Sequence, residues 1–137
     1  MESSEEFIQR FLDEAAKLNT LQFETRAPFY QKFFSKEQFE YFFDSFKRRE
    51  ASPEQLVSIE TVASEGTCEQ KARAITAHLI GKNPRRARYT LCINDGQWEI
   101  SGIESECWLC NGNGLRGQQK CEQCEGNGWI NYARTAT

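Results

Sequence analysis

The 137-residue chain has no long apolar segment, no large excess of either charge and only one histidine. No apolar run approaches the roughly 20 residues that a membrane-spanning helix requires, so we expect the chain not to cross a membrane. The first ten residues, MESSEEFIQR, are acidic where a secretion signal is basic and then apolar, which predicts a cytoplasmic protein. The net charge of −3 provides no general attraction to nucleic acid or to an anionic membrane.

Large apolar residues are scarce toward the C-terminus. All ten phenylalanines lie at or before Phe46, whereas residues 105–137 hold five of the nine glycines and four of the six cysteines. The large apolar side chains of this last segment are Trp108, Leu109, Leu115, Trp129, Ile130 and Tyr132. So short a segment with so few apolar groups requires a metal or disulfides to fold. We therefore divide the chain into a domain at residues 1–104 and a module at residues 105–137.

The first part of the domain shows helical periodicity. Ser3 and Glu6 form a capping box, and apolar residues then recur at helical spacing as far as Leu18. A second helix is expected to start near Pro28, because proline suits the first turn.

A third helix is predicted after a second capping box, formed by Ser35 and Gln38. Its apolar stripe consists of Phe39, Phe42, Phe43 and Phe46. We interpret this stripe as a face that packs into the core, with a phenylalanine-lined ligand groove as the alternative.

From Gln55 onward the apolar period changes to two. The alternating positions are Val57, Ile59, Thr61 and Ala63 in one run and Ala87, Tyr89, Leu91 and Ile93 in another. Asp95 and Gly96 follow the second run and predict a hairpin, because both residues tolerate positive φ. Residues 68–80 carry helix and strand signals, and we predict a strand because sequential strands pair through short turns. Together these elements predict an α+β fold, with N-terminal helices packed on a curved antiparallel sheet.

The run RYTLCINDGQWEISGIE, at residues 88–104, resembles the closing hairpin of the nuclear transport factor two-like family, also called cystatin-like cones. The match rests on Trp98, Ile100 and Ile103. The resemblance implies a cone-shaped domain over residues 1–104. That family includes enzymes, binding proteins and dimerisation modules, so such a fold does not settle function. An exposed face of such a sheet would permit a homodimer.

The sequence CWLCNGNG begins at Cys107 and returns 14 residues later as CEQCEGNG. A structural zinc ion takes four ligands in a tetrahedron, with Zn–S distances of about 2.3 Å, and each Cys-x-x-Cys turn supplies two thiolates. The ten residues between the two pairs are enough to form a hairpin that brings the second pair back to the first. The repeat therefore predicts one zinc site with four cysteine ligands, which are Cys107, Cys110, Cys121 and Cys124.

The glycines of the repeat have a role in the same site. Positive φ at these glycines would turn backbone N–H groups toward the sulfurs, and Asn113 and Asn127 can also adopt the left-handed region. The glycines are Gly112, Gly114, Gly126 and Gly128. Because four thiolates leave no position for water, we expect no hydrolysis at this metal. The alternatives are two disulfides, which a cytoplasmic location disfavours, and thioredoxin-like redox chemistry, which the helix-breaking glycines disfavour.

Both copies match the Cys-x-x-Cys-x-Gly-x-Gly motif of the cysteine-rich region of DnaJ-type chaperones at every fixed position. The resemblance covers residues 107–130 and implies zinc binding and contact with polypeptides. DnaJ proteins carry four copies and two zinc ions, so two copies imply one ion. The His-Pro-Asp triplet of a J-domain is missing, since His78 is followed by Leu79, and no activity on an Hsp70-type partner is implied.

Other chemically interesting residues have simpler interpretations. Cys68 and Cys92 stand alone in the sequence, and Cys92 is expected to be an ordinary small residue, buried or half-buried. His78 is interpreted as a structural histidine; as a general base in the cone interior it would require a carboxylate partner that the sequence does not identify. The basic residues Lys82, Arg85, Arg86 and Arg88 are expected to form a solvated hairpin end.

Three functions remain open at this point. The first is a non-catalytic protein, adaptor or chaperone-like, in which one structural zinc supports recognition of another protein or polypeptide, with Trp108 and Trp129 either packing the module or presenting apolar surface. The second is an enzyme or small-molecule binder that uses the cone interior, with zinc as a structural element. The third, nucleic-acid binding through the zinc module and the basic hairpin, ranks last because the chain is acidic.

Overall fold

The computed structural model describes residues 2–18, 23–41, 54–64, 66–78, 86–107 and 109–131, and only the backbone of residues 23–25, 78 and 131. The helices are α1 (Ser4–Leu18), α2 (Phe23–Phe33) and α3 (Lys36–Tyr41). The long strands are β1 (Glu54–Val62), β2 (Lys71–His78), β3 (Arg86–Asn94) and β4 (Gln97–Glu106). The short strands are β5 (Leu115–Arg116), β6 (Gln119–Lys120) and β7 (Trp129–Asn131). None of the described helices has the length and apolar character needed to span a membrane.

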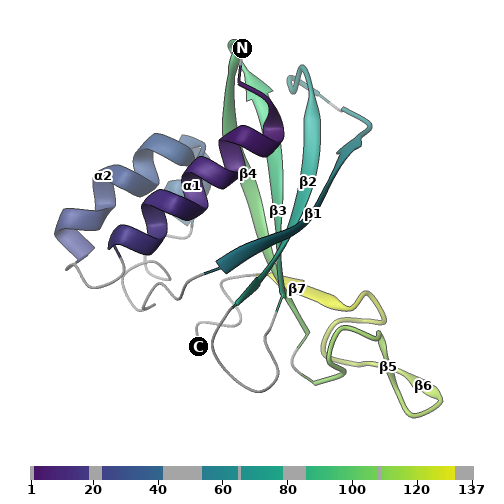
Figure 1. The fold of residues 1–137 in the computed structure, drawn as a ribbon. Helices are drawn as coiled ribbons and strands as arrows, with labels where there is room; N and C mark the ends of the chain where they lie inside the picture. The colour runs from purple at the N-terminus through teal and green to yellow at the C-terminus, as the bar shows by residue number, and fades with distance from the viewer. Residues whose placement is uncertain are drawn as a thin grey trace.

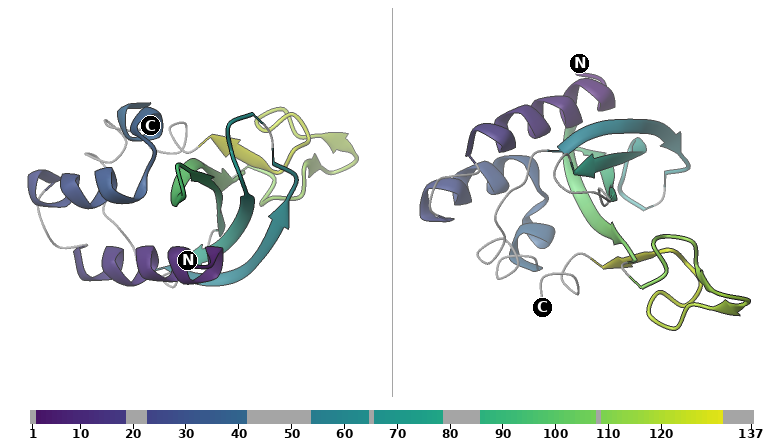
Figure 2. Two further views of the ribbon diagram at one scale, coloured as in Figure 1. Left: turned by 90° about the horizontal axis from the view of Figure 1, so that it is seen from above. Right: turned by 60° about the horizontal axis from the view of Figure 1, so that its bottom comes forward.

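The strands form a five-stranded antiparallel sheet in the order β1-β2-β3-β4-β7, and β5 pairs with β6 in a separate hairpin. Helices α1 and α2 lie on one side of the sheet, and the segment with β5 and β6 projects from one end, away from these helices (Figures 1 and 2). The α+β class is thus confirmed. The strand predicted within residues 68–80 is confirmed as β2.

Helix α1 begins at the predicted capping box. The Ser3 N–H donates to Glu6 Oε1 at 3.2 Å, and the Glu6 N–H donates to Ser3 Oγ at 3.1 Å. The apolar face that follows is buried against the sheet and α2, at Phe7, Ile8, Phe11 and Leu12. The N-terminus of the helix would otherwise leave unsatisfied N–H groups, so the box determines where this face begins.

Helix α2 starts five residues before the predicted position, so that Pro28 lies inside it and the expected start near Pro28 is wrong. Proline lacks an N–H and weakens a helix interior. Aromatic packing compensates for this loss, because the Phe29 and Phe33 rings lie 5.3 and 5.4 Å from the Phe11 ring of α1. Tertiary contacts therefore override the local preference of proline for a first turn.

Helix α3 follows the cap predicted at Ser35. The Gln38 N–H donates to Ser35 Oγ at 3.2 Å, whereas the Ser35 N–H donates to the Ile100 carbonyl of β4 at 3.0 Å. The helix is thereby tied to the sheet, and Phe39 packs partly buried against the core. The remaining members of the predicted stripe, Phe42, Phe43 and Phe46, lie outside the described residues.

The sheet reproduces the predicted alternation of β3, whose Ala87, Tyr89, Leu91 and Ile93 are all buried. The hairpin turn is also confirmed, with positive φ of 53° at Asp95 and 76° at Gly96. In β1 the alternation is interrupted by a bulge between Leu56 and Ser58, which leaves Val57 58% exposed. The expectation that Val57 shares a face with Ile59 is therefore wrong, because one extra residue reverses the facing of the side chains before it.

Candidate metal centre

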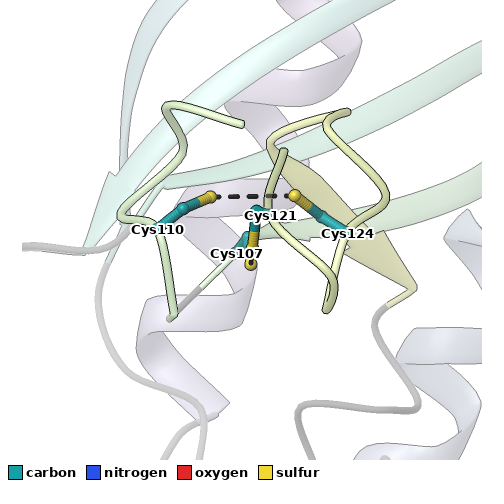
Figure 3. A group of neighbouring side chains, drawn as sticks. All are labelled: Cys107, Cys110, Cys121 and Cys124. Atoms are coloured by element: carbon teal, nitrogen blue, oxygen red, sulfur yellow. Dashed lines mark hydrogen bonds between the residues drawn. The ribbon is translucent and has the colours of Figure 1, made fainter. Parts of the chain in front are cut away.

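The four predicted ligands come together at the base of the projecting segment, with their sulfur atoms pointing toward one another (Figure 3). All four Sγ atoms lie within 4.8 Å of one another. The Cys107 and Cys121 sulfurs are 3.8 Å apart, and the Cys110 and Cys124 sulfurs are 3.7 Å apart. A tetrahedron with metal–sulfur distances of about 2.3 Å has edges of about 3.8 Å. The residues present therefore fit a four-coordinate cation, and at these distances none of the four is joined in a disulfide.

Each copy of the repeat folds through the same set of hydrogen bonds. In the first copy the Gly112 N–H donates to the Cys107 carbonyl at 3.2 Å and the Asn113 N–H donates to the Cys110 carbonyl at 3.1 Å. In the second copy the equivalent bonds, from Gly126 and Asn127, measure 3.1 and 3.0 Å. The repeated sequence thus produces a repeated turn that presents two thiols each time.

Backbone N–H groups point at the sulfurs, as predicted. Gly114 N–H donates to Cys110 Sγ at 3.2 Å, and Gly128 N–H donates to Cys124 Sγ at 3.1 Å. The copies are also joined to each other, because the Cys107 N–H donates to the Gly128 carbonyl at 2.8 Å. The matching bond, from the Cys121 N–H to the Gly114 carbonyl, is also 2.8 Å long. The arrangement places N–H dipoles where thiolate charge would collect.

Only glycine fits at the last position of each copy. A Cβ on Gly114 would lie 2.5 Å from the Gly126 carbonyl oxygen, and a Cβ on Gly128 would lie 2.6 Å from the Gly112 carbonyl oxygen. The non-glycine residues with positive φ in the repeat are Asn111 and Glu125, directly after the second cysteine of each copy. The expectation that Asn113 and Asn127 adopt the left-handed region is therefore wrong. The backbone N–H groups of those asparagines instead donate to the cysteine carbonyls.

Burial and hydrogen bonding separate the acidities of two of the thiols. Cys107 and Cys121 are fully buried, and Cys110 and Cys124 are 5% and 6% exposed. Burial raises the pKa of the Cys107 thiol to about 11. Burial acts in the same direction on Cys124, but the Gly128 N–H and the neighbouring thiols outweigh it and lower its pKa to about 7. The Cys124 thiol therefore ionises near neutral pH even without a bound cation.

Strand β7 attaches this centre to the sheet. Trp129 lies opposite Glu106 of β4, and the guanidinium carbons of Arg88 and Arg86 lie 4.8 and 5.6 Å from its ring centroid. Trp129 therefore packs the module onto the domain, while Trp108 lies outside the described residues. Strand β4 itself continues through residue 104, where we divided the chain, to Glu106.

The predicted basic hairpin end is solvated only in part where the structure describes it. Arg86 Nε donates to Glu106 Oε2 at 2.6 Å, and Arg88 pairs with Glu104 at 2.7 Å. The Arg88 side chain is only 17% exposed. The expectation is wrong for Arg88, which lies half-buried in β3 against a β4 carboxylate, whereas Arg86, at the start of β3, is 44% exposed beside Glu106 and is solvated as expected. Lys82 and Arg85 lie outside the described residues.

The cysteines interpreted as isolated are paired in space. The structure joins Cys68 and Cys92 in a disulfide, with a Cα–Cα distance of 5.5 Å across 24 residues of sequence. Cys92 is half-buried in β3, as expected from its alternation with Leu91 and Ile93. Sequence separation concealed the pairing, because only the β2–β3 register brings the turn before β2 alongside Cys92.

Strand pairing places a carboxylate residue, Glu54, next to the position of His78, and the sequence analysis did not identify it. Glu54 lies opposite His78 in the β1–β2 register. The Glu54 carboxylate accepts hydrogen bonds from the Tyr89 hydroxyl at 2.8 Å and from the Thr76 hydroxyl at 2.7 Å. The side chain of His78 lies outside the described residues. No local sequence signal identifies Glu54 as this neighbour, since the pairing of β1 with β2 brings the two positions together.

Comparisons of the chain with protein-family models, with curated proteins and with solved structures gave no match. We therefore infer function from the geometry of the site and from the two sequence resemblances.

Proposed function

We propose that the chain is a non-catalytic zinc-binding protein, with one structural zinc held by Cys107, Cys110, Cys121 and Cys124. The observation that carries this proposal is the clustering of four buried sulfurs within 4.8 Å of one another, with two of the distances at 3.7 and 3.8 Å and two backbone N–H groups directed at the cluster. Sulfur-only tetrahedral sites favour zinc, and four protein ligands leave no position for a reacting water. When bound, the zinc would cross-link the two turns of a segment with little apolar core of its own.

Metal analysis of the purified full chain under reducing conditions tests the proposal. We expect one zinc per chain in the wild type and a substantial loss of zinc in Cys121→Ser. The matched control is Cys92→Ser, which removes a cysteine outside the cluster and should retain the zinc. A wild-type protein without zinc, or a Cys121→Ser variant with the full amount, would contradict the assignment.

We further propose that the module, which resembles the DnaJ-type cysteine-rich region, belongs to a protein-interaction protein of adaptor or chaperone-like type. Two features support this proposal. The β5–β6 hairpin projects away from the helices (Figure 1), and it carries Leu115 with 55% of its surface exposed. The exposed Leu115, at the start of β5 on this projecting hairpin, would be available for apolar contact with a polypeptide. Affinity capture from cell extract, with and without chelator, tests this proposal. A partner protein that is captured only without chelator binds in a way that depends on the module.

A second candidate function is small-molecule binding inside the proposed cone. The observation that favours it is the polar group formed by Glu54, Thr76 and Tyr89 on the core side of the sheet, at the register position of His78. Glu54→Gln would weaken ligand binding there and leave the zinc content unchanged. Nucleic-acid binding has less support, because Arg86 and Arg88 are already paired with carboxylates.

A further inference from the structure

The metal centre accounts for four of the six cysteines, and the remaining two form a separate cluster. Cys68 lies in the turn before β2, and Cys92 lies in β3. We propose that Cys68 and Cys92 are a reversible dithiol–disulfide site, which reacts with low-molecular-weight disulfides and thiols and works independently of the four-cysteine centre.

The backbone holds the two cysteines together without help from the sulfur–sulfur bond. The Glu69 N–H donates to the Ile93 carbonyl at 3.0 Å, and the Ile93 N–H donates to the Gln70 carbonyl at 2.9 Å. These bonds extend the β2–β3 ladder up to the residue after Cys68. The Cα–Cα distance of 5.5 Å lies within the range that a disulfide requires. The bond can therefore open and close while the neighbouring hydrogen bonds persist.

The two sets of cysteines differ in access. Cys68 and Cys92 are both half-buried, whereas the metal-centre cysteines are at most 6% exposed. Cys92 also lies on the sheet face opposite to its buried neighbours Leu91 and Ile93, and the helices pack on the core face (Figure 2). A small reagent therefore reaches the pair more readily than the four-cysteine centre, and thiol reactivity depends on such access.

The chemistry balances with a disulfide as the oxidant. A thiolate of the pair attacks one sulfur of the small disulfide, which forms a mixed disulfide and releases one thiol. The second protein thiolate then attacks the protein sulfur of the mixed disulfide and releases the second thiol. Two electrons pass from the protein sulfurs to the reagent, and the two protons leave on the two released thiols. A thiol in excess reverses both steps.

Equilibration of the zinc-loaded full chain in glutathione buffers of graded composition tests the proposal. Free thiols are counted by alkylation after acid quenching and denaturation with chelator, and zinc is measured before the quench. We expect the count to fall from six to four as glutathione disulfide increases, with zinc unchanged, and to return to six in excess dithiothreitol. Peptide mapping should show a Cys68–Cys92 link in the oxidised sample.

Two variants make the test independent of how the wild type behaves. Cys68→Ser should retain one glutathione on Cys92, because no second thiol can displace it, and the double variant Cys68→Ser/Cys92→Ser should take up none at equal zinc content. The proposal is overturned if the wild type keeps all six thiols in excess glutathione disulfide. It is also overturned if the disulfide resists excess dithiothreitol, or if zinc leaves in step with oxidation. Absence of zinc from the starting protein would instead contradict the proposed metal centre.

Discussion

At the scale of single residues, the two glycines that end each copy of the repeat have separate tasks. The first glycine of each copy closes the turn by donating to the carbonyl of the first cysteine. The second, Gly114 or Gly128, donates to a sulfur and lies against the backbone of the other copy. Both halves of the centre therefore depend on a position where a Cβ would meet a carbonyl oxygen.

Replacing Gly114 by alanine should destabilise the module by about 2–4 kcal/mol, because strain at positive φ adds to a clash with backbone that cannot move freely. The matched control is Gly117→Ala, since Gly117 also has positive φ but has no atom within 4 Å of an added Cβ. The control substitution should destabilise the module by about 1 kcal/mol. Denaturant unfolding followed by a zinc competition titration measures both variants. If Gly114→Ala and Gly117→Ala lose the same amount of stability, the close approach between the two copies is unimportant.

Zinc affinity should decrease as the pH falls, because zinc binds thiolates and protons compete for them. Above pH 7 the Cys124 thiol, with its pKa lowered to about 7, is already ionised, whereas the Cys107 thiol, with its pKa raised to about 11, still has to lose its proton. Below pH 7 Cys124 also carries a proton, which zinc must displace. The affinity should therefore fall more steeply below pH 7 than above it, in competition titrations against a chelator of known pH dependence. A uniform slope across pH 7 would contradict this expectation.

At the scale of secondary-structure elements, the junction of β4 and β7 connects the two parts of the chain. Arg88 of β3 pairs with Glu104, its neighbour in β4, and its guanidinium group lies over the ring of Trp129 in β7, the next strand of the sheet. Glu106 performs a related task, since it accepts from Arg86 and its side chain lies over Gly112. The sheet thus positions the first turn of the metal centre through side chains of three neighbouring strands.

Arg88→Ala should destabilise the protein by about 1–2 kcal/mol, because it removes a half-buried ion pair and a cation–π contact together. The change should also raise amide exchange in β7. The exposed Arg116 of β5 offers the control, and Arg116→Ala should change stability by less than about 0.5 kcal/mol. Unfolding curves and hydrogen exchange on both variants measure these effects. If the Arg88→Ala protein is as stable as the control variant, Arg88 does not stabilise the junction of β4 and β7.

At the scale of the whole molecule, two buried clusters stabilise the described part of the chain. The first joins the aromatic faces of the helices to the inner face of the sheet. The second consists of the four cysteines with Ile130, and Leu109 packs against it. Because the second cluster contains so little apolar surface, its stability is expected to depend on the metal. Dimerisation through the sheet stays a prediction.

Chelation of the metal, or the Cys121→Ser change, should remove amide protection from residues 107–131 while β1 to β4 keep theirs. Metal binding in small sites contributes about 10–16 kcal/mol of apparent free energy, which the small second cluster cannot replace. Hydrogen exchange with mass spectrometry resolves the two regions. Loss of protection in both regions together would show that the parts fold as one cooperative unit.

Sequence patterns predicted much of this structure because they are local. The capping box at Ser3, the alternation of β3 and the Asp95–Gly96 turn each depend on residues within a few positions, and each is confirmed. The prediction for Pro28 failed because aromatic packing from α1 outweighs the local cost of proline within a helix. Val57 was misplaced because a bulge has no clear signature in an alternating run.

The four-cysteine cluster was predictable for a related reason: the spacing of Cys107, Cys110, Cys121 and Cys124 matches the two Cys-x-x-Cys turns that a tetrahedral metal site requires. The Cys68–Cys92 pair and the neighbours Glu54 and His78 carry no such spacing, since strand register alone brings each pair together. Contacts between distant residues depend on how strands align and on which side chains the core must bury. That alignment is a property of the assembled sheet, and no short stretch of the chain contains it.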